Sequence, residues 1–261
     1  MALYDEFAEI YARGSYPAFA ACIADLLPAV LERLSADPTT LLDVACGEGT
    51  FSVAMAARGL QVTGIDLSPR MIDLARRRAS AEGVDIQFLC HDMCDLPFSG
   101  EFDLVTCWYD SLNYLLSQRA LGSAFHAAYR ALVPGGTYAF DMNTIYGLAV
   151  NWRQSECYIQ RDAGDVFEVH RPRYDFETDI ATLQITAFVQ ERNRWRRVEE
   201  EHRERGYRFD VIRSLLRDAG FVELGVYANL RDLSPPSPES GRLFFFCRKQ
   251  GEPPRRSEDI A

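Results

Sequence analysis

The chain has 261 residues, of which 48% are hydrophobic, and a formal net charge of −10 at pH 7. This hydrophobic share is ample for a buried core, so disorder is expected only at the ends. The negative charge would repel a phosphate backbone, which favours a small-molecule partner and argues against nucleic acid.

The cysteines and the amino-terminal residues indicate where such a protein works. The seven cysteines contain no Cys-x-x-Cys pair, so neither a disulfide framework nor a zinc knuckle is indicated. The opening residues, MALYDEFAEI, lack the basic segment of a signal peptide, and no stretch approaches about 18 uncharged apolar residues. We therefore expect a cytoplasmic protein that does not span a membrane.

The first half of the chain alternates between two hydrophobic periods. Residues 4–34 are predicted to be helical, with a break at 12–17. From Thr40 onward, short apolar runs that end in Gly or Asp alternate with helical stretches, as in parallel βαβ units. Predicted strands cover residues 41–45, 61–65, 86–89, 102–107 and 136–141, and predicted helices cover 50–58, 69–82 and 118–132.

Between residues 155 and 207 polar and apolar residues alternate, which predicts antiparallel strands with one solvated face. A helix at 210–220 and strands at 221–227 and 242–248 follow. The predicted fold is α/β, a Rossmann-like doubly wound seven-stranded sheet with a reversed final hairpin. It makes one domain over 1–250, with 155–207 as an inserted antiparallel β lid over a substrate and 251–261 as a disordered tail.

The strongest motif is LLDVACGEGTFS, residues 41–52, where an apolar strand enters a glycine turn and then a helix. Gly47 and Gly49 allow a tight turn and close approach of the backbone to a ligand. Alone, such a turn occurs in several nucleotide-binding folds and sometimes only as a turn.

A second strand ends in Asp66, 19 residues after Gly47, where a carboxylate can accept hydrogen bonds from both ribose hydroxyls. An NAD enzyme would share these features. However, Ser52 departs from the Gly or Ala usual at the third position of the dinucleotide fingerprint, and no dehydrogenase chemistry follows. A third strand ends at Asp92, which is placed to accept from an adenine amino group.

In this order and spacing, DVACGEGT, GIDLS, HDM, FDLVTCWYDSLNYL and LVPGGTYAFD resemble the motifs of class I S-adenosylmethionine-dependent methyltransferases. The chain is most similar to the bacterial YqeM-like group, in its YDEFAEIY opening, its DSLNYL segment and EEEHRERGY. The resemblance implies S-adenosylmethionine as cofactor, with the backbone at 45–47 near the methionine part, Asp66 at the ribose, and Asp92 and Met93 at the adenine. The residues that it places at the cofactor are Tyr11, Asp43, Ala45, Cys46, Gly47, Gly49, Asp66, Leu67, Met71, Asp92, Met93 and Trp108.

Two of these assignments have plain structural alternatives. Trp108 is expected near the sulfonium together with Tyr109, but an aromatic residue at a strand end also fills core space. Tyr11 belongs to a helix that the resemblance places over the cofactor, although the same stripe suits ordinary packing.

The acceptor side is predicted in DSLNYL, just past the carboxyl end of a strand. There Asp110 takes a proton, holds an ammonium group or merely caps a helix, and Tyr114 joins it on the acceptor wall. His202, flanked by carboxylates, is a candidate general base or a solvated strand residue. His91 beside Cys90 and Cys94 does not gather tetrahedral ligands, so we predict no metal site.

We thus predict a methyltransferase that acts on a small-molecule acceptor at N or O. A protein or RNA methyltransferase, a non-catalytic cofactor-binding module and an NAD-linked oxidoreductase are the alternatives. The sequence leaves the acceptor, the use of a general base, the oligomeric state and the pathway open.

Overall fold

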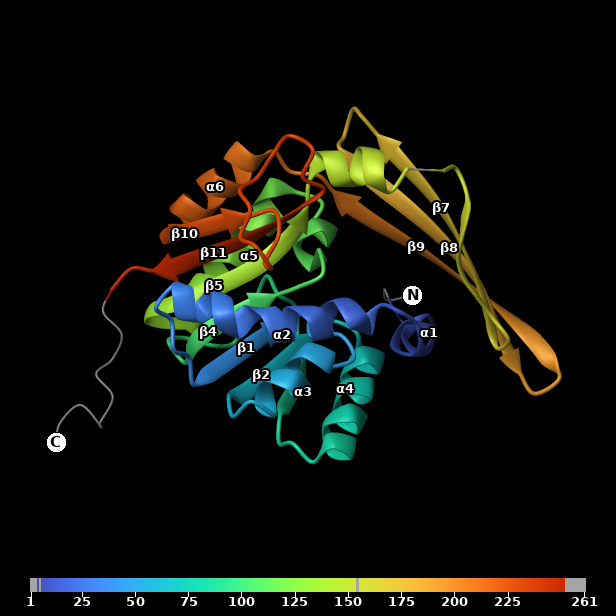
Figure 1. The fold of residues 1–261 in the computed structure, drawn as a ribbon, viewed down its shortest axis with the longest axis horizontal. Coiled ribbons are helices and arrows are strands. Elements are labelled where there is room, and N and C mark those ends of the chain that lie inside the picture. Colours follow the sequence, from blue (N-terminus) through green and yellow to red (C-terminus); the bar gives the residue numbers. More distant parts are fainter. Residues whose placement is uncertain (1–3, 5, 154, 252–261) are drawn as a thin grey trace.

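The computed structural model describes residues 4, 6–153 and 155–251, which form two β-sheets (Figure 1). The larger sheet has the strand order β10-β11-β5-β4-β1-β2-β3. Its strands are β1 (Thr40–Val44), β2 (Gln61–Asp66), β3 (Gln87–Cys90), β4 (Phe102–Cys107), β5 (Leu132–Asn143), β10 (Phe221–Tyr227) and β11 (Arg242–Lys249). The tail predicted to be disordered lies outside the described residues, apart from Gly251.

The strands β1 to β5 run parallel to one another, and β11 is antiparallel to both β5 and β10. This confirms the predicted seven-stranded α/β sheet with its reversed final hairpin. The strand β5 starts four residues before the predicted position, because Leu132 already pairs with Phe102 of β4, and after a register shift the pairing resumes at Thr137.

Successive residues of β1 point into different cores. Leu42 packs with Phe125 and Leu216 on one face of the sheet, and Leu41 packs with Leu27 and Phe51 on the other. This two-sided burial explains why the inner strands are continuously apolar. One core is closed by α5 (Gln118–Ala131) and α6 (Phe209–Asp218), and the other by α2 (Pro17–Arg33) and α3 (Thr50–Ala56).

The helix α4 (Pro69–Glu82) has the end signals that its sequence predicts. The side chain of Ser68 accepts a hydrogen bond from the Met71 amide at 3.3 Å, and Pro69 occupies the first turn. Gly83, at φ 68°, ends the helix in the left-handed conformation. The start of α4 is thereby fixed directly after Asp66.

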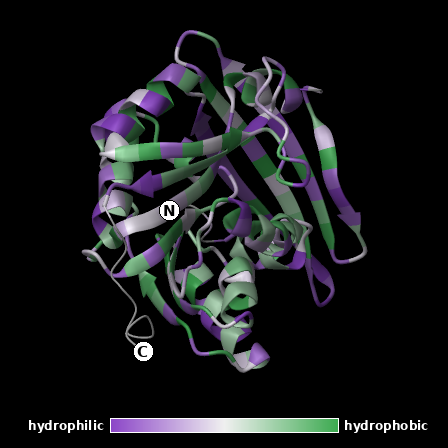
Figure 2. Cartoon of the chain, turned by 60° about the vertical axis from the view of Figure 1, so that its left-hand side comes forward, coloured by the Kyte–Doolittle hydropathy of each residue, from purple (hydrophilic) through white to green (hydrophobic). Residues whose placement is uncertain are grey.

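A separate four-stranded antiparallel sheet follows β5 and a π-helical turn (Gly147–Asn151). Its strands are β6 (Tyr158–Ala163), β7 (Val166–Asp175), β8 (Ile180–Glu191) and β9 (Arg194–Arg205). Hydrophilic and hydrophobic residues alternate along them, as Figure 2 shows. The predicted antiparallel insertion is therefore confirmed, and its action as a lid stays a prediction.

The inserted sheet contacts the amino-terminal segment. Phe7 and Ile10, in and beside α1 (Ala8–Arg13), pack with Val166, Ala187 and Val198 in one buried cluster. In Figure 1, α1 lies between the large sheet and the inserted strands. None of the described helices is long and apolar enough to cross a membrane.

Candidate active site

The glycine turn and Asp66 meet because β1 and β2 are parallel neighbours, with Val44 opposite Ile65. One carboxylate oxygen of Asp66 accepts from the Gly47 amide at 2.9 Å, and the other accepts from the Ser68 amide at 2.8 Å. Burial raises the pKa of the Asp66 carboxyl, and the hydrogen bonds from Ser68 and Gly47 partly offset this rise. The carboxylate therefore ties the turn to the start of α4.

Gly49 is required for steric reasons. It has φ 86°, and a Cβ at this position would lie 2.9 Å from the Cβ of Ala75 on α4. Gly47 also has a positive φ of 55°, but a Cβ there would meet nothing within 4 Å. Gly47 thus faces open space, whereas Gly49 allows α3 and α4 to pack closely.

A cavity of about 70 Å³ opens beside this turn. Its wall includes eight of the residues that the sequence assigns to the cofactor: Tyr11, Asp43, Ala45, Cys46, Gly47, Asp66, Met71 and Trp108. The fold therefore brings together residues from β1, β2, α4, the end of β4 and the amino-terminal helix.

Four residues assigned to the cofactor do not line this cavity. Gly49 lies behind the turn, and Leu67 is 63% exposed. Asp92 is exposed, and its carboxylate accepts from the Cys94 amide at 2.8 Å. Met93 packs against the core that α5 and α6 close. Their contacts with the cofactor stay predictions.

Sequence reasoning missed Glu48, which also lines the cavity. Its side chain is buried and forms an ion pair with Arg78 of α4. An acidic residue between the two glycines is the signal that would have indicated it.

Asp43 is fully buried under the turn. Its carboxylate accepts from the Ser52 hydroxyl at 2.6 Å and from the Thr106 hydroxyl at 3.1 Å. Burial raises its pKa to about 7, although the two hydroxyls lower it. The serine that departs from the dinucleotide fingerprint therefore serves as a donor to Asp43.

The lining of this cavity has polar groups that suit a nucleoside ligand. The Asp66 carboxylate has about four acceptor sites, of which the two amides take one each, so two hydroxyls can still be bound. The indole nitrogen of Trp108 is buried without a hydrogen-bond partner among the described residues, which leaves a free donor on the wall. Trp108 also packs edge-on against Phe51, so both of its predicted roles are compatible with its position.

A second cavity of about 180 Å³ adjoins the first and shares Tyr4, Tyr11 and Tyr109 with it. The three candidate catalytic residues, Asp110, Tyr114 and His202, all lie on its wall. Residues of the inserted sheet form the opposite side. Such adjacency is what transfer of a group between two bound molecules requires.

The side chain of Asp110 makes no capping hydrogen bond to the short helix that follows it. Its neighbour Tyr109 and Asp110 itself have φ values of 62° and 53°, and the Asp141 carboxylate accepts from both of their amides, at 2.6 and 3.1 Å. Arg242 donates to Asp110 at 2.6 Å and also pairs with Asp141. Sequence reasoning missed Arg242, because it lies 132 residues from Asp110 in the chain.

The charge of Arg242 is held by these two partners. Burial disfavours the charged guanidinium, but the carboxylates of Asp110 and Asp141 outweigh this effect and raise its pKa. Burial likewise raises the pKa of Asp141, while Arg242 lowers it. Glu204, on the same cavity wall, has a pKa raised by burial and by the negative charge of Asp110.

His202 belongs to a hydrogen-bonded chain of buried side chains. Its Nδ1 lies 2.9 Å from the Tyr114 hydroxyl, which lies 2.9 Å from the hydroxyl of Tyr4. Its Nε2 lies 3.2 Å from a carboxylate oxygen of Glu200. His202 is 2% exposed, so the interpretation of it as a solvated strand residue is wrong.

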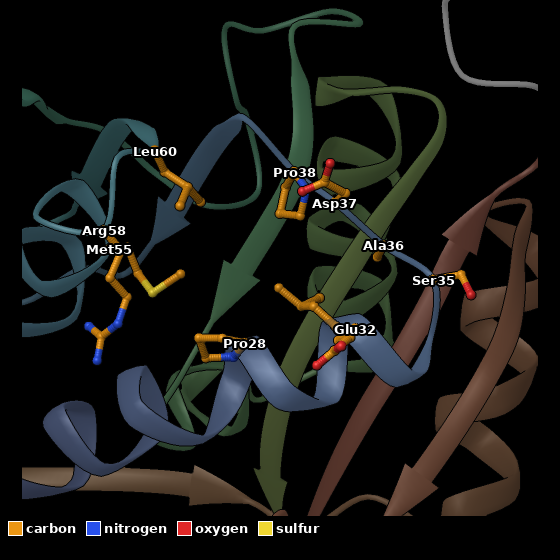
Figure 3. A pocket seen from close by; sticks show the side chains of 10 residues that line it. Pro28, Glu32, Ser35, Ala36, Asp37, Pro38, Met55, Arg58 and Leu60 are labelled. Atoms are coloured by element: carbon orange, nitrogen blue, oxygen red, sulfur yellow. The ribbon is translucent and has the colours of Figure 1, made fainter.

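A larger pocket of about 440 Å³ lies away from these groups (Figure 3). Pro28 and Glu32 of α2, Pro38 before β1, and Met55 and Leu60 contribute to its wall. It opens near the amino end of β1, whereas ligands of open α/β sheets bind beyond the carboxyl ends of strands. We therefore place the active site at the two smaller cavities.

Comparison with known proteins shows the family of the chain. Residues 41–136 match a family described as a methyltransferase domain. The chain is 32% identical over 216 residues to a Geobacillus sp. (strain WCH70) protein with a methyltransferase name, covering 80% of this chain and 84% of that protein. It is 31% identical over 210 residues to YqeM of Bacillus subtilis (strain 168), also named as a methyltransferase, covering 80% and 83%.

Two solved structures share the fold. An S-adenosylmethionine-dependent methyltransferase from Clostridium acetobutylicum ATCC 824 matches with a TM-score of 0.82 and 24% identity, covering 96% of this chain and all of the other. The sugar N-methyltransferase KedS8 from Streptoalloteichus sp. ATCC 53650 matches with a TM-score of 0.74 and 20% identity, covering 96% and 94%. Sheet and glycine turn are thus those of a class I S-adenosylmethionine-dependent methyltransferase. The chain belongs to this family, in the group that includes YqeM.

Proposed function

We propose that this methyltransferase transfers a methyl group to nitrogen or oxygen of a small molecule. The observation that carries the proposal is the pair of adjoining cavities at the carboxyl edge of the sheet, which share three tyrosines. One has the acceptors for a ribose, and the other is lined by aromatic and ionisable side chains.

In the smaller cavity, Asp66 would accept from the ribose hydroxyls, and the backbone at 45–47 would face the methionine part. Trp108 would lie beside the sulfonium. When bound, S-adenosylmethionine supplies a methyl group that is already activated for transfer. The protein therefore needs chiefly to exclude water and align the acceptor.

In the larger cavity, His202 would take a proton from the acceptor, with Tyr114 orienting its ring through Nδ1. Asp110, fixed by Arg242, would orient the acceptor from the side of the large sheet. The inserted strands would act as the lid, since Tyr158, His170 and His202 all line this cavity.

The size of the acceptor cavity supports a small molecule. A volume of about 180 Å³ with walls from two sheets suits a small molecule better than an RNA strand. KedS8, a fold relative, is named for methylating a sugar at nitrogen. The net charge of −10 also opposes binding of RNA.

Calorimetry with S-adenosylmethionine, S-adenosylhomocysteine and NAD tests the cofactor assignment. We expect binding of the first two and none of NAD. Binding of NAD alone would contradict the assignment. A titration with single-stranded RNA at physiological salt should show no binding, and salt-sensitive binding at low micromolar concentration would favour a macromolecular acceptor.

A further inference from the structure

The inserted sheet contains the pattern Glu-x-His twice. Glu168 and His170 lie on β7, and Glu200 and His202 lie on β9. Side chains two residues apart on a strand share a face. In the register of the sheet His170 pairs with Ile185 of β8, and Ile185 pairs with Glu200 of β9, so both patterns are on the same face.

The two patterns have similar surroundings. Glu168 lies 2.5 Å from Nε2 of His170, whose Nδ1 lies 3.2 Å from the Tyr158 hydroxyl. Tyr16 donates to Glu168. Glu200 and Tyr114 flank His202 in the same way. Both histidines are at least 97% buried and line the acceptor cavity.

Each pattern also leaves one buried atom free. The second carboxylate oxygen of Glu168 has no hydrogen-bond partner among the described residues, and Nε2 of His202 has the Glu200 carboxylate at 3.2 Å but makes no hydrogen bond there. A buried acceptor without a donor is unfavourable unless a ligand supplies one. Glu168 contacts His170, which lines the acceptor cavity, and the negative charge next to that histidine favours a cationic ligand.

The charges around the acceptor cavity also favour a cationic ligand. Arg242 is the one lysine or arginine on the described wall, and Asp110 and Asp141 already bind it. Within the part of the chain that the structure describes, Glu168 and Glu200 have only histidines as ionic partners. The remaining wall is rich in tyrosine rings, whose faces attract cations.

We propose that the methyl acceptor is an amine that enters as its ammonium ion, and that the two Glu-x-His pairs of the insertion select it. This inference rests on the proposed function. His202 takes one proton from the ammonium group. The freed nitrogen lone pair then bonds to the methyl carbon as the carbon–sulfur bond breaks with its electron pair left on sulfur. The methylated amine leaves with one positive charge.

The test uses the full chain saturated with S-adenosylhomocysteine, whose own binding checks the proposed function separately. Calorimetry then compares two shape-matched pairs, cyclohexylamine with cyclohexanol and glucosamine with glucose. We expect the amine of at least one pair to bind about tenfold or more tightly than its hydroxyl partner. Equal or tighter binding of both alcohols, or no binding of either amine by a protein that binds S-adenosylhomocysteine, overturns the proposal.

Two variants test the residues. Glu168→Gln and Glu200→Gln should each remove most of the preference for the amine while binding of S-adenosylhomocysteine is retained. Glu201→Gln is the matched control, since Glu201 is exposed on the opposite face of β9. An undiminished amine preference in folded Glu168→Gln and Glu200→Gln proteins would assign the selection to other groups. Circular dichroism verifies folding, and the wild-type comparison decides the question if either variant unfolds.

Discussion

Replacing Asp66 by Asn separates the two tasks of its carboxylate. In the wild type the oxygens accept the Gly47 and Ser68 amides at 2.9 and 2.8 Å, and the remaining lone pairs are available for two ribose hydroxyls. The substitution turns one oxygen into a donor, which faces one of those two amides. Loss of hydrogen bonds to a charged acceptor costs about 1.5–3 kcal/mol, so the dissociation constant should rise about 10- to 150-fold.

Calorimetry with S-adenosylhomocysteine measures this change, and urea unfolding checks that the turn still folds. Asp85→Asn is the matched control, because Asp85 is exposed before β3, away from the glycine turn, and undergoes the same change of charge and shape. The control should bind as the wild type does. A folded Asp66→Asn protein with wild-type affinity would refute the assignment of Asp66 to the ribose.

Three further predictions concern stability. Arg242→Gln leaves two buried carboxylates without their cation and should lower the free energy of unfolding in urea by about 3–5 kcal/mol. Arg213→Gln breaks a more exposed ion pair and should cost less than about 1 kcal/mol. Similar losses in the two variants would contradict the buried network. Gly49→Ala should lower the melting temperature more than Gly59→Ala, because both glycines have positive φ but only the former meets a neighbour. The folded-state pKa of Asp43, about 7, exceeds the unfolded value, so its contribution to stability is full at low pH and lost as pH rises through 7. Asp43→Asn should therefore flatten the stability decline between about pH 4 and pH 7 by up to about 1.4 kcal/mol per pH unit, and an unchanged slope would place this titration elsewhere.

The cofactor side was predictable because its signals are local. Gly47 lies 19 residues from Asp66, and a strand, a turn and a helix in sequence fix where both must end. Arg242 could not be found in this way. Its contact with Asp141 depends on the antiparallel register of β11 with β5, where Arg242 pairs with Asn143, and nothing in the local sequence sets that register.

The inserted sheet shows a different limit. Along β7, hydrophobicity alone predicts that Phe167 and Val169 face inward and that Glu168 and His170 face solvent. The structure has the reverse, with Glu168 and His170 buried and the two apolar residues only half-buried. Alternation shows which residues share a face of the strand, but it does not show which of the two faces is buried. Buried polar residues are expected where a sheet forms a functional site.

The two walls of the acceptor cavity differ in how they are held. On one side Tyr109 and Asp110 adopt left-handed conformations that cost about 1 kcal/mol or more each, and Asp141 of the large sheet holds both amides. On the other side Glu200 of the insertion accepts from the amides of Tyr4 and Phe7 at 3.1 and 3.2 Å. The amino-terminal segment is thus joined to the inserted sheet through Glu200, and its Tyr4 hydroxyl also contacts Tyr114 on the side of the large sheet.

The attachment of Tyr4 to the inserted sheet affects how the cofactor enters its cavity. The smaller cavity holds about 70 Å³, well below the roughly 300 Å³ at which ligand sites usually begin, and Tyr4 and Tyr11 are among the residues that narrow it. Because Glu200 ties Tyr4 to the insertion, displacement of the amino-terminal segment would also disturb the His202 side of the acceptor cavity. Cofactor binding and the shape of the acceptor cavity are then coupled through the Glu200 carboxylate. Glu200→Gln should therefore change the affinity for the acceptor when the protein is saturated with S-adenosylhomocysteine, and it should leave the glycine turn, which Asp66 holds, unchanged.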